Sequence, residues 1–266
     1  MKAIVCVKQV PDTQGKVAVK ADGTMDRSAM ATITNPDDLN AVEAALQLKD
    51  ETGCEVVVVT MGPPPAEGML RELMARGADR GVLVSGREFG GSDTFATSQI
   101  LAAAVNKIGV GPEDIVFCGR QAIDGDTAQV GPQIAEKLHL PQVTYVTDIK
   151  KDGNSLTVKR QLEDGYMELR VQTPCLLTCI KELNNPRYMS IGGILSTYSK
   201  PLTTLGYEDL KDHPLIDATT IGLKGSPTNI FKSFTPPQKG VGMMLEGDGK
   251  ETCEKLAGIL AAKHII

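Results

Sequence analysis

The sequence predicts an α/β protein with a Rossmann-like, mainly parallel sheet flanked by helices, an antiparallel addition to that sheet and an extended C-terminal arm. Over the first 140 residues, short apolar runs alternate with segments of helical spacing, which is typical of βαβ units with parallel strands. The run Val56-Val57-Val58-Val59 has no alternation of polar and apolar side chains, as expected of a strand buried on both faces. After residue 140, strand-like runs are joined by Asp-Gly turns, which indicates antiparallel pairing.

Each strand of the parallel part is followed by a turn and a helix start. Asn35-Pro36 precedes two acidic residues, a pattern that suits a helix N-terminus, and Ser92 or Asp93 is a cap for a helix beginning at Thr94. Asp22-Gly23 marks a hairpin. The expected strands are 3–9, 55–61, 80–85 and 115–118, and the expected helices lie within 35–52, 65–77, 94–105 and 133–138.

The last third of the chain has a different character. Further strands are expected at 143–149, 155–162, 166–172 and 175–180. Residues 188–233 are rich in Gly, Pro, Ser and Thr with little periodicity, and so long a loosely structured segment is unusual inside a compact domain. A terminal helix is expected at 251–263. We therefore expect a nucleotide-binding α/β domain at 1–187, and an arm at 188–266 that packs on another protein.

Composition excludes several function classes. A net charge of −5 and an aromatic content of 4% disfavour nucleic-acid binding, which selects basic surfaces and stacking side chains. No apolar run is long enough to cross a bilayer, and the first residues enter a strand at once without a signal peptide, so a cytoplasmic location is expected. Six dispersed cysteines and three histidines indicate reduced thiols and no metal site.

The segment Gly119–Pro132 is the strongest candidate site. It joins a buried strand to a helix and is rich in Gly and Asp. The unpaired N–H groups at a helix start carry partial positive charge, so such a turn can bind a phosphate; the alternative is an ordinary capped turn. Right-handed crossovers place it on the same sheet edge as the loops 7–12, 61–65 and 86–93. The G-x-G-x-x-G fingerprint is absent from the first loop, which disfavours a conventional Rossmann dehydrogenase.

Several short segments, taken together, resemble the beta subunit of electron-transfer flavoproteins. They occur in that family's order over essentially the whole chain. The segments are Val5-Cys6-Val7-Lys8-Gln9-Val10-Pro11-Asp12-Thr13, Asn35-Pro36, Gly77-Ala78-Asp79-Arg80-Gly81, Gly119-Arg120-Gln121-Ala122-Ile123-Asp124, Leu183-Asn184-Asn185-Pro186-Arg187-Tyr188 and Pro236-Pro237-Gln238. The resemblance implies an obligate heterodimer with an alpha subunit that carries a redox-active FAD. It also implies that the segment 186–191 recognises an acyl-CoA dehydrogenase, with Ile191 as the docking residue; the alternative is that Ile191 is buried in the subunit interface.

Two branches of the family differ in the ligand of the beta subunit. Ordinary members hold AMP as a structural ligand, whereas electron-bifurcating members hold a second FAD. That FAD accepts hydride from NADH and divides the electrons between a low-potential acceptor, ferredoxin or flavodoxin, and the alpha-subunit FAD. The composition of 124–132 and the polar helix start 92–98 favour FAD, and only this branch would make the chain part of an NADH-oxidising enzyme. A universal-stress-type nucleotide-binding protein is an alternative from another class.

The resemblance implies a set of cofactor-binding residues and no catalytic side chain, because hydride and electron transfer belong to the cofactor. Met61 has core packing as its alternative role, Asp38 has helix capping, and Arg120 has a surface ion pair. The implied cofactor-binding residues are Cys6, Val7, Lys8, Asn35, Asp38, Met61, Gly62, Asp93, Thr94, Thr97, Gly119, Arg120, Gln121, Asp124, Gly125, Asp126, Thr127, Ala128, Gln129, Val130, Gly131 and Pro132.

Overall fold

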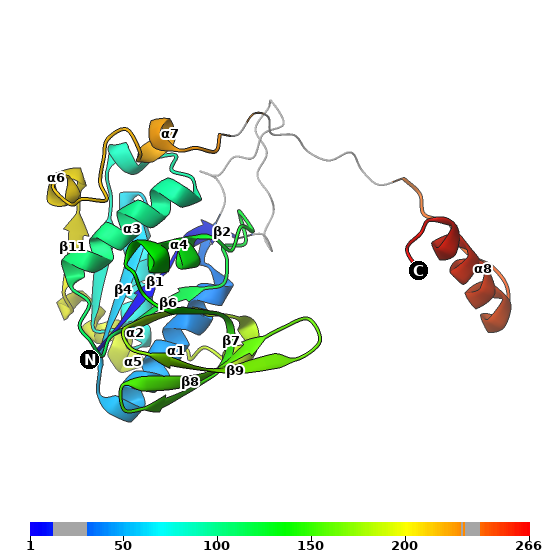
Figure 1. The fold of residues 1–266 in the computed structure, drawn as a ribbon, viewed down its shortest axis with the longest axis horizontal. Coiled ribbons are helices and arrows are strands. Elements are labelled where there is room, and N and C mark those ends of the chain that lie inside the picture. The colour runs from blue at the N-terminus through cyan, green and yellow to red at the C-terminus, as the bar shows by residue number, and fades with distance from the viewer. Residues whose placement is uncertain (13–30, 230, 232–239) are drawn as a thin grey trace. The chain divides into compact units, whose positions relative to one another are not determined.

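The computed structural model describes residues 1–12, 31–229, 231 and 240–266. The hairpin expected around Asp22-Gly23 lies outside these residues. Within them the chain forms a nine-stranded sheet, a separate two-stranded sheet and eight α-helices. The chain divides into two units, a large one that holds both sheets and a small one that contains the C-terminal helix (Figure 1).

The large sheet confirms the predicted fold class. Its strand order is β11-β5-β4-β1-β6-β10-β7-β8-β9, parallel from β11 to β7 and antiparallel over the last three strands. The strands are β1 (Lys2–Cys6), β4 (Glu55–Met61), β5 (Arg80–Val84), β6 (Ile115–Gly119), β7 (Gln142–Asp152), β8 (Ser155–Gln161), β9 (Tyr166–Gln172), β10 (Cys175–Cys179) and β11 (Leu202–Leu205). The strands that follow β1 in the chain, β4 and β5, lie on one side of it and β6 lies on the other. This reversal is a topological switch point, where ligands of α/β proteins bind.

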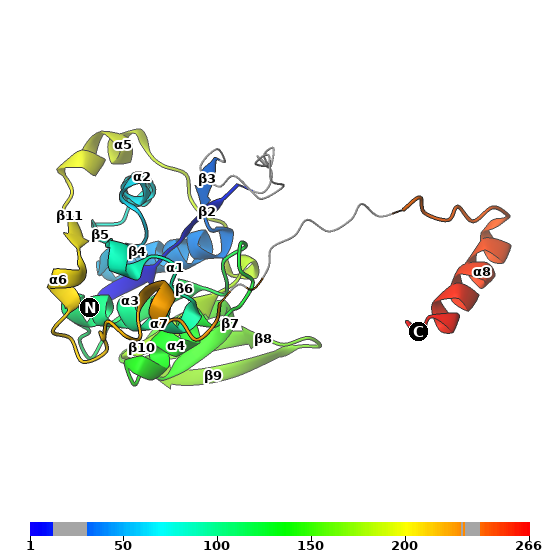
Figure 2. The ribbon, with the colours of Figure 1, turned by 90° about the horizontal axis from the view of Figure 1, so that it is seen from above.

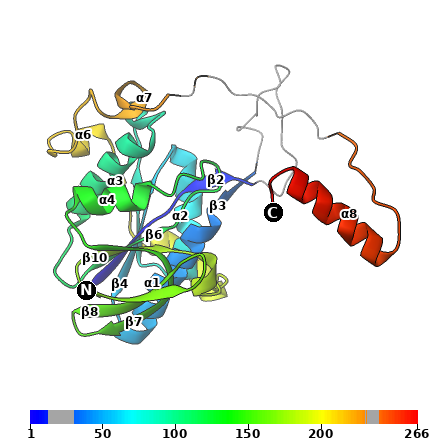
Figure 3. The ribbon, with the colours of Figure 1, turned by 45° about the vertical axis from the view of Figure 1, so that its right-hand side comes forward.

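Helices cover both faces of the sheet because alternate strand residues point to opposite sides. Val5, Val56 and Val58 pack in one buried cluster with α1 (Pro36–Thr52) and α2 (Glu67–Arg76). Ile4 and Val57 pack in the other with α3 (Thr94–Ile108) and α4 (Val130–Lys137). Figure 2 shows the two pairs on opposite sides of the sheet, and Figure 3 shows α3 and α4 side by side.

Two element boundaries next to the predicted site differ from the sequence prediction. The first strand ends at Cys6 rather than residue 9, and the next residues form β2 (Gln9–Pro11), which pairs with β3 (Thr32–Thr34) in the two-stranded sheet. Helix α4 begins at Val130, three residues before its expected start, because Gly131 and Pro132 are accepted in a first helical turn, where the N–H that Pro lacks is unpaired anyway.

The segment after residue 187 is more structured than its sequence indicates. It forms α5 (Ile191–Ser196), β11, α6 (Tyr207–Leu210) and α7 (Gly222–Gly225), and β11 pairs in parallel with β5. The large unit therefore continues to Phe231, well beyond the boundary at 187 that periodicity suggests. These elements have only four to six residues, too few for a repeating apolar pattern.

The small unit contains α8 (Gly249–Ala262), which the sequence analysis predicted at 251–263. Asp248 caps it by accepting a hydrogen bond from the Glu251 N–H. No residue of α8 is buried. An amphipathic helix of this kind needs a partner surface for its apolar side.

Candidate functional site

A cavity of about 320 Å³ lies at the carboxyl ends of β1, β4 and β6. It therefore occupies the switch point of the sheet, as the order of the loops predicts. Its walls come from the end of β1, the start of α3 and the whole turn between β6 and α4. The lining residues are Cys6, Val7, Lys8, Asp38, Met61, Ser92, Asp93, Thr94, Thr97, Leu101, Cys118, Gly119, Arg120, Gln121, Ala122, Gly125, Asp126, Thr127, Ala128, Gln129, Val130 and Gly131.

The turn between β6 and α4 presents main-chain N–H groups to this cavity. Asp126 and Ala128 have left-handed backbones, with φ of 50° and 52°, a conformation that is uncommon for residues other than Gly and costs free energy. Among the described residues, the N–H groups from Thr127 to Gly131 donate no hydrogen bond. Unpaired N–H groups at the start of a helix form an anion site, so the turn has the donors that a phosphate group requires.

Asn35 holds this turn in place. Its side chain is buried, and its Nδ2 donates to the Gln121 carbonyl at 2.8 Å while its Oδ1 accepts from the Ile123 N–H at 3.1 Å. Asn35 precedes α1 but makes no side-chain capping bond to that helix. The amide oxygen and the amide nitrogen of Asn35 thus both bind the turn and fix its backbone. Asn35 itself does not line the cavity.

Asp38 forms part of the cavity floor and joins β1 to β6. One carboxylate oxygen accepts the Lys8 N–H at 2.7 Å and the other accepts the Gly119 N–H at 3.0 Å. Burial raises the pKa of Asp38 to about 7, against the opposing effect of these hydrogen bonds and one from Asn35. A Cβ at Gly119 would lie 2.3 Å from Asp38 Oδ1, so a side chain cannot be accommodated there.

Two cationic side chains line the cavity, and each is held by a carboxylate. Lys8 Nζ lies 2.7 Å from Asp124 Oδ1. Arg120 Nε lies 3.2 Å from Asp37 Oδ2 in an ion pair that lacks the geometry of a hydrogen bond. Burial raises the pKa of Asp37, while Arg120 acts in the opposite direction. The Arg120 guanidinium also lies 6.0 Å from the ring centroid of Tyr145.

Helix α3 also begins at the cavity. Asp93 caps it by accepting the Ala96 N–H at 3.0 Å, and its other oxygen accepts the Thr228 N–H at 2.9 Å. Burial alone would raise the pKa of Asp93, but these hydrogen bonds outweigh burial and lower it. Thr94 Oγ1 lies 3.0 Å from Gln129 Oε1, so the start of α3 is tied to the turn before α4.

A larger cavity, of about 860 Å³, adjoins the first one. The two share the lining residues Lys8, Met61 and Ser92, so they are neighbours at the same edge of the sheet. The second cavity is otherwise bounded by the loops that follow β4 and β5 and by β2.

The thiols near the cavity are suited to packing rather than chemistry. A hydrogen bond with Cys6, together with burial, raises the pKa of the Cys118 thiol, and burial raises that of Cys179. Neutral thiols are poor nucleophiles and metal ligands. The described residues contain no cluster of three or more His, Cys, Asp or Glu arranged for a metal ion, and no described helix is long and apolar enough to cross a membrane.

Most of the residues selected from the sequence come together in the first cavity. Four of them, Asn35, Gly62, Asp124 and Pro132, do not line it; Gly62 and Asp124 line the second cavity instead. Sequence reasoning missed Ser92, Leu101, Cys118 and Ala122. The sequence could have indicated these four residues, because each lies next to, or one helical turn from, a residue that was selected.

The predicted docking residue Ile191 is the first residue of α5 and is 79% exposed. It is therefore not buried by the described residues of the large unit. Tyr188, Leu195 and Tyr198 are exposed to a similar degree. We call these four residues the α5 face.

The fold and cavity define a three-layer α/β protein with a nucleotide-type site at its switch point. Residues 22–210 match the model of the electron transfer flavoprotein domain. Over the full length of both chains, the sequence is 68% identical to the acryloyl-CoA reductase electron transfer subunit gamma of Anaerotignum propionicum. It is likewise 53% identical to the caffeyl-CoA reductase-Etf complex subunit CarD of Acetobacterium woodii and 47% identical to the electron transfer flavoprotein subunit beta of Clostridium acetobutylicum.

The chain therefore belongs to the electron-transfer flavoprotein family and is a subunit of the beta type. Its role is in electron transfer. Membership of this family sets aside the universal-stress-type alternative.

Proposed function

We propose that this subunit binds FAD across the two adjoining cavities, accepts hydride from NADH, and bifurcates the electrons. One electron would pass to ferredoxin or flavodoxin, and the other, through the FAD of an alpha subunit, to an acyl-CoA dehydrogenase. FAD supplies the redox chemistry when it is bound. The protein contributes position, electrostatics and exclusion of water.

The observation that carries this proposal is that the two cavities lie side by side and share three lining residues. A mononucleotide requires only a phosphate site with a pocket for one base, and the first cavity provides both. The second cavity, which shares Lys8, Met61 and Ser92 with the first, would offer space for the other half of a dinucleotide. Small-molecule and cofactor pockets in proteins have volumes of roughly 300–1,000 Å³. The first cavity, of about 320 Å³, is at the lower end of this range, and the second adds about 860 Å³ for a larger ligand such as FAD.

The residues present fit such a ligand. The N–H groups from Thr127 to Gly131 would hold the pyrophosphate, and Lys8 and Arg120 would offset its negative charge. Hydroxyl groups at the start of α3, from Thr94 and Thr97, would face the polar edge of the flavin ring. No side chain is required as an acid or a base.

The names of the relatives support the proposed redox partner. Two of them are electron transfer subunits of an acryloyl-CoA reductase and a caffeyl-CoA reductase complex, and both names concern enzymes of CoA thioesters. We extend this to the present chain by proposing that the α5 face docks an enzyme of the acyl-CoA dehydrogenase type. The exposed apolar side chains of this face suit an interface anchor.

The decisive experiment is a flavin count on the purified alpha–beta heterodimer, combined with anaerobic titration by NADH. We expect two FAD molecules per heterodimer, no AMP, and bleaching of the flavin absorbance by NADH. One FAD together with one AMP, and no bleaching by NADH, would refute the proposal. That result would establish the second candidate, a beta subunit with structural AMP, which the small size of the first cavity favours.

A further inference from the structure

The segment that carries the α5 face is bound to helices α1 and α2 by ion pairs, hydrogen bonds and close backbone contact. We infer that Arg187 and Gly193 are positioning residues, which fix the α5 face in one orientation so that it can dock its redox partner without prior ordering. The inference rests on the docking role proposed above. It adds a reason for the affinity of the α5 face for that partner: the face has a fixed geometry before the partner binds.

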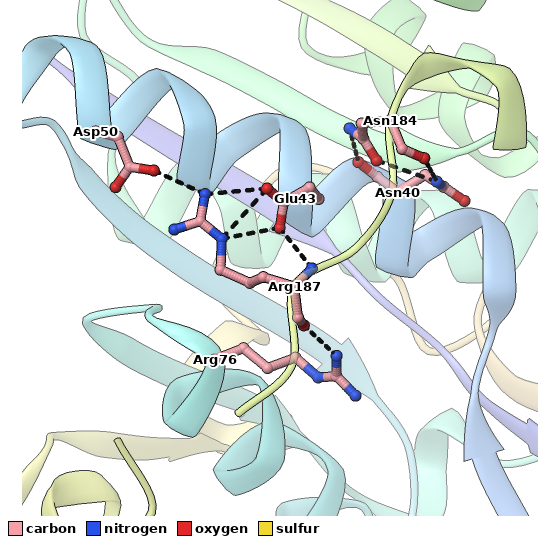
Figure 4. A network of polar contacts seen from close by, with 6 residues as sticks. All are labelled: Asn40, Glu43, Asp50, Arg76, Asn184 and Arg187. Carbon is pink, nitrogen blue, oxygen red and sulfur yellow. Dashed lines mark hydrogen bonds and ion pairs between the residues drawn. The ribbon is translucent and has the colours of Figure 1, made fainter. Parts of the chain in front are cut away.

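Arg187 is the centre of a network that ties the segment before α5 to helix α1 (Figure 4). Its Nε and Nη2 bind the Glu43 carboxylate at 2.9 and 3.0 Å, and Nη2 also binds Asp50 at 2.7 Å. Its main-chain N–H donates to Glu43 Oε2 at 3.0 Å. Hydrogen bonds from Glu43 and Asp50 raise the pKa of Arg187. The side chain and the backbone of Arg187 are thus fixed by the same carboxylate.

The network also reaches α2 and the residues just before Arg187. Arg76, in the last turn of α2, donates to the Arg187 carbonyl at 2.5 Å. Asn184 and Asn40 bind each other reciprocally, each amide donating to the main-chain carbonyl of the other at 2.9 to 3.0 Å. The chain therefore leaves the body of the protein at Arg187 with its direction set by two helices.

Helix α5 itself lies in direct contact with α2 (Figure 2). A Cβ added to Gly193 would lie 1.9 Å from the Ala75 carbonyl oxygen, so the two backbones touch and only Gly fits. Beyond α5, Arg71 of α2 donates to the Thr197 and Lys200 carbonyls at 3.0 and 3.2 Å. The chain is thus held in place before α5 at Arg187, within α5 at Gly193, and after α5 at Thr197 and Lys200.

The exposed side chains of this segment include four large apolar or aromatic ones, of which Tyr198 also has its ring centroid 5.3 Å from the Arg71 guanidinium. Tyr188, Ile191, Leu195 and Tyr198 are 91%, 79%, 78% and 79% exposed. A surface that is already ordered avoids the conformational entropy that a flexible loop loses on binding. Firm attachment of an exposed apolar face is therefore what a docking surface needs, and loss of the attachment should weaken docking.

Neighbouring glycines in α5 provide a matched test. Gly193→Ala must push α5 away from α2, whereas a Cβ at Gly192 meets no atom within 4 Å. We would measure the dissociation constant of each flavin-loaded heterodimer for acryloyl-CoA reductase from Anaerotignum propionicum, prepared without its own electron transfer subunits. The expected result is about tenfold weaker docking for Gly193→Ala and less than a twofold change for Gly192→Ala. Amide hydrogen exchange of residues 188–198 should accelerate only in Gly193→Ala.

A second pair of variants tests Arg187. Arg187→Lys keeps the charge but cannot bind Glu43 and Asp50 at the same time. Arg170→Lys is its control, because the Arg170–Asp152 pair is exposed and 3.9 Å apart. We expect weaker docking and faster exchange for Arg187→Lys, with unchanged flavin content. Lower thermal stability of Gly193→Ala and Arg187→Lys with wild-type docking and exchange would overturn the inference.

Ile191→Ser separates this inference from the proposed function. Weaker docking of Ile191→Ser with normal exchange establishes the α5 face as the docking surface. If Ile191→Ser docks like the wild type, the α5 face is not that surface, and the positioning roles fall with it. If Ile191→Ser weakens docking but Gly193→Ala does not, only the positioning roles are refuted.

Discussion

Gly125 and Gly131 both line the first cavity, but a side chain would meet different surroundings at the two positions. A Cβ at Gly131 would lie 2.8 Å from Thr178 Cγ2 and 3.4 Å from Cys118 Cβ. Gly131 therefore lets α4 approach β6 and β10 closely. At Gly125 a Cβ meets nothing within 4 Å, and the backbone there is not left-handed.

This contrast predicts different results for Gly131→Val and Gly125→Val. Gly131→Val should lower the free energy of unfolding by about 1–3 kcal/mol, the usual cost of overpacking, and should lower nucleotide occupancy as well. Gly125→Val should reduce occupancy while leaving stability nearly unchanged, because its side chain would occupy ligand space only. Thermal unfolding and the nucleotide released on denaturation measure the two effects. Equal loss of stability in both variants would contradict the assignment.

The raised pKa of Asp38 leads to a second prediction, on how the stability of the protein depends on pH. Its folded-state pKa of about 7 lies above its ordinary value of 3.8, so the folded protein binds the proton more tightly than the unfolded chain. Stability should therefore fall as pH rises from about 4 to 7, by up to about 1.4 kcal/mol for each unit of pKa difference. Asp38→Asn should lose a hydrogen bond to a main-chain N–H, which lowers stability below pH 4, and its stability should decline less than that of the wild type as pH rises.

Asp114→Asn is the control for this titration. Burial alone would raise the pKa of Asp114, but hydrogen bonds from the Gly111 and Lys2 main-chain N–H groups outweigh burial and lower it. The stability that Asp114 contributes is fully present above pH 4 and is lost only below it. Urea unfolding at pH 5 and pH 7.5 should therefore show the wild-type slope in Asp114→Asn. A wild-type slope in Asp38→Asn would show that Asp38 is not the group that titrates.

At the scale of elements, apolar runs were sufficient to predict the buried part of the sheet. β4, β5 and β6 lie at or within a residue of their expected positions, because a strand covered on both faces must be apolar throughout. β11 could not be predicted: it is a four-residue edge strand with two exposed threonines. Its pairing with β5 depends on contacts between residues about 120 positions apart, which no local pattern records.

The site was predictable to the extent that it follows from topology. The loops after parallel strands must meet at one sheet edge, and this rule identified most of the residues that line the cavity. The role of Asn35 was not predictable, because a residue placed as a helix cap uses its amide to hold a turn 86 positions away. The bulge in β7, where Tyr145 has a φ of 57° beside Arg120, likewise has no sequence signal, since bulky residues rarely adopt left-handed backbones.

At the scale of the whole molecule, the large unit buries both core clusters and contains both cavities. The terminal helix α8 contributes no buried residue. Its apolar positions Cys253, Leu256 and Leu260 have the spacing of one helical face. Such a face has the form of a contact for another subunit, and the family places an alpha subunit beside the beta subunit.

Deletion of residues 249–266 should therefore separate folding from assembly. We expect the truncated chain to keep the thermal midpoint of the full-length beta subunit within a few degrees, because the large unit has both core clusters within itself. Association with the alpha subunit, measured by co-purification and by sedimentation, should be lost or weakened at least tenfold. Leu256→Ser with Leu260→Ser should weaken association in the same way, whereas Glu254→Ser, a change at an exposed charged position of the same helix, should not. A large fall in the thermal midpoint on truncation, with association intact, would mean that α8 stabilises its own subunit and that the alpha subunit binds elsewhere.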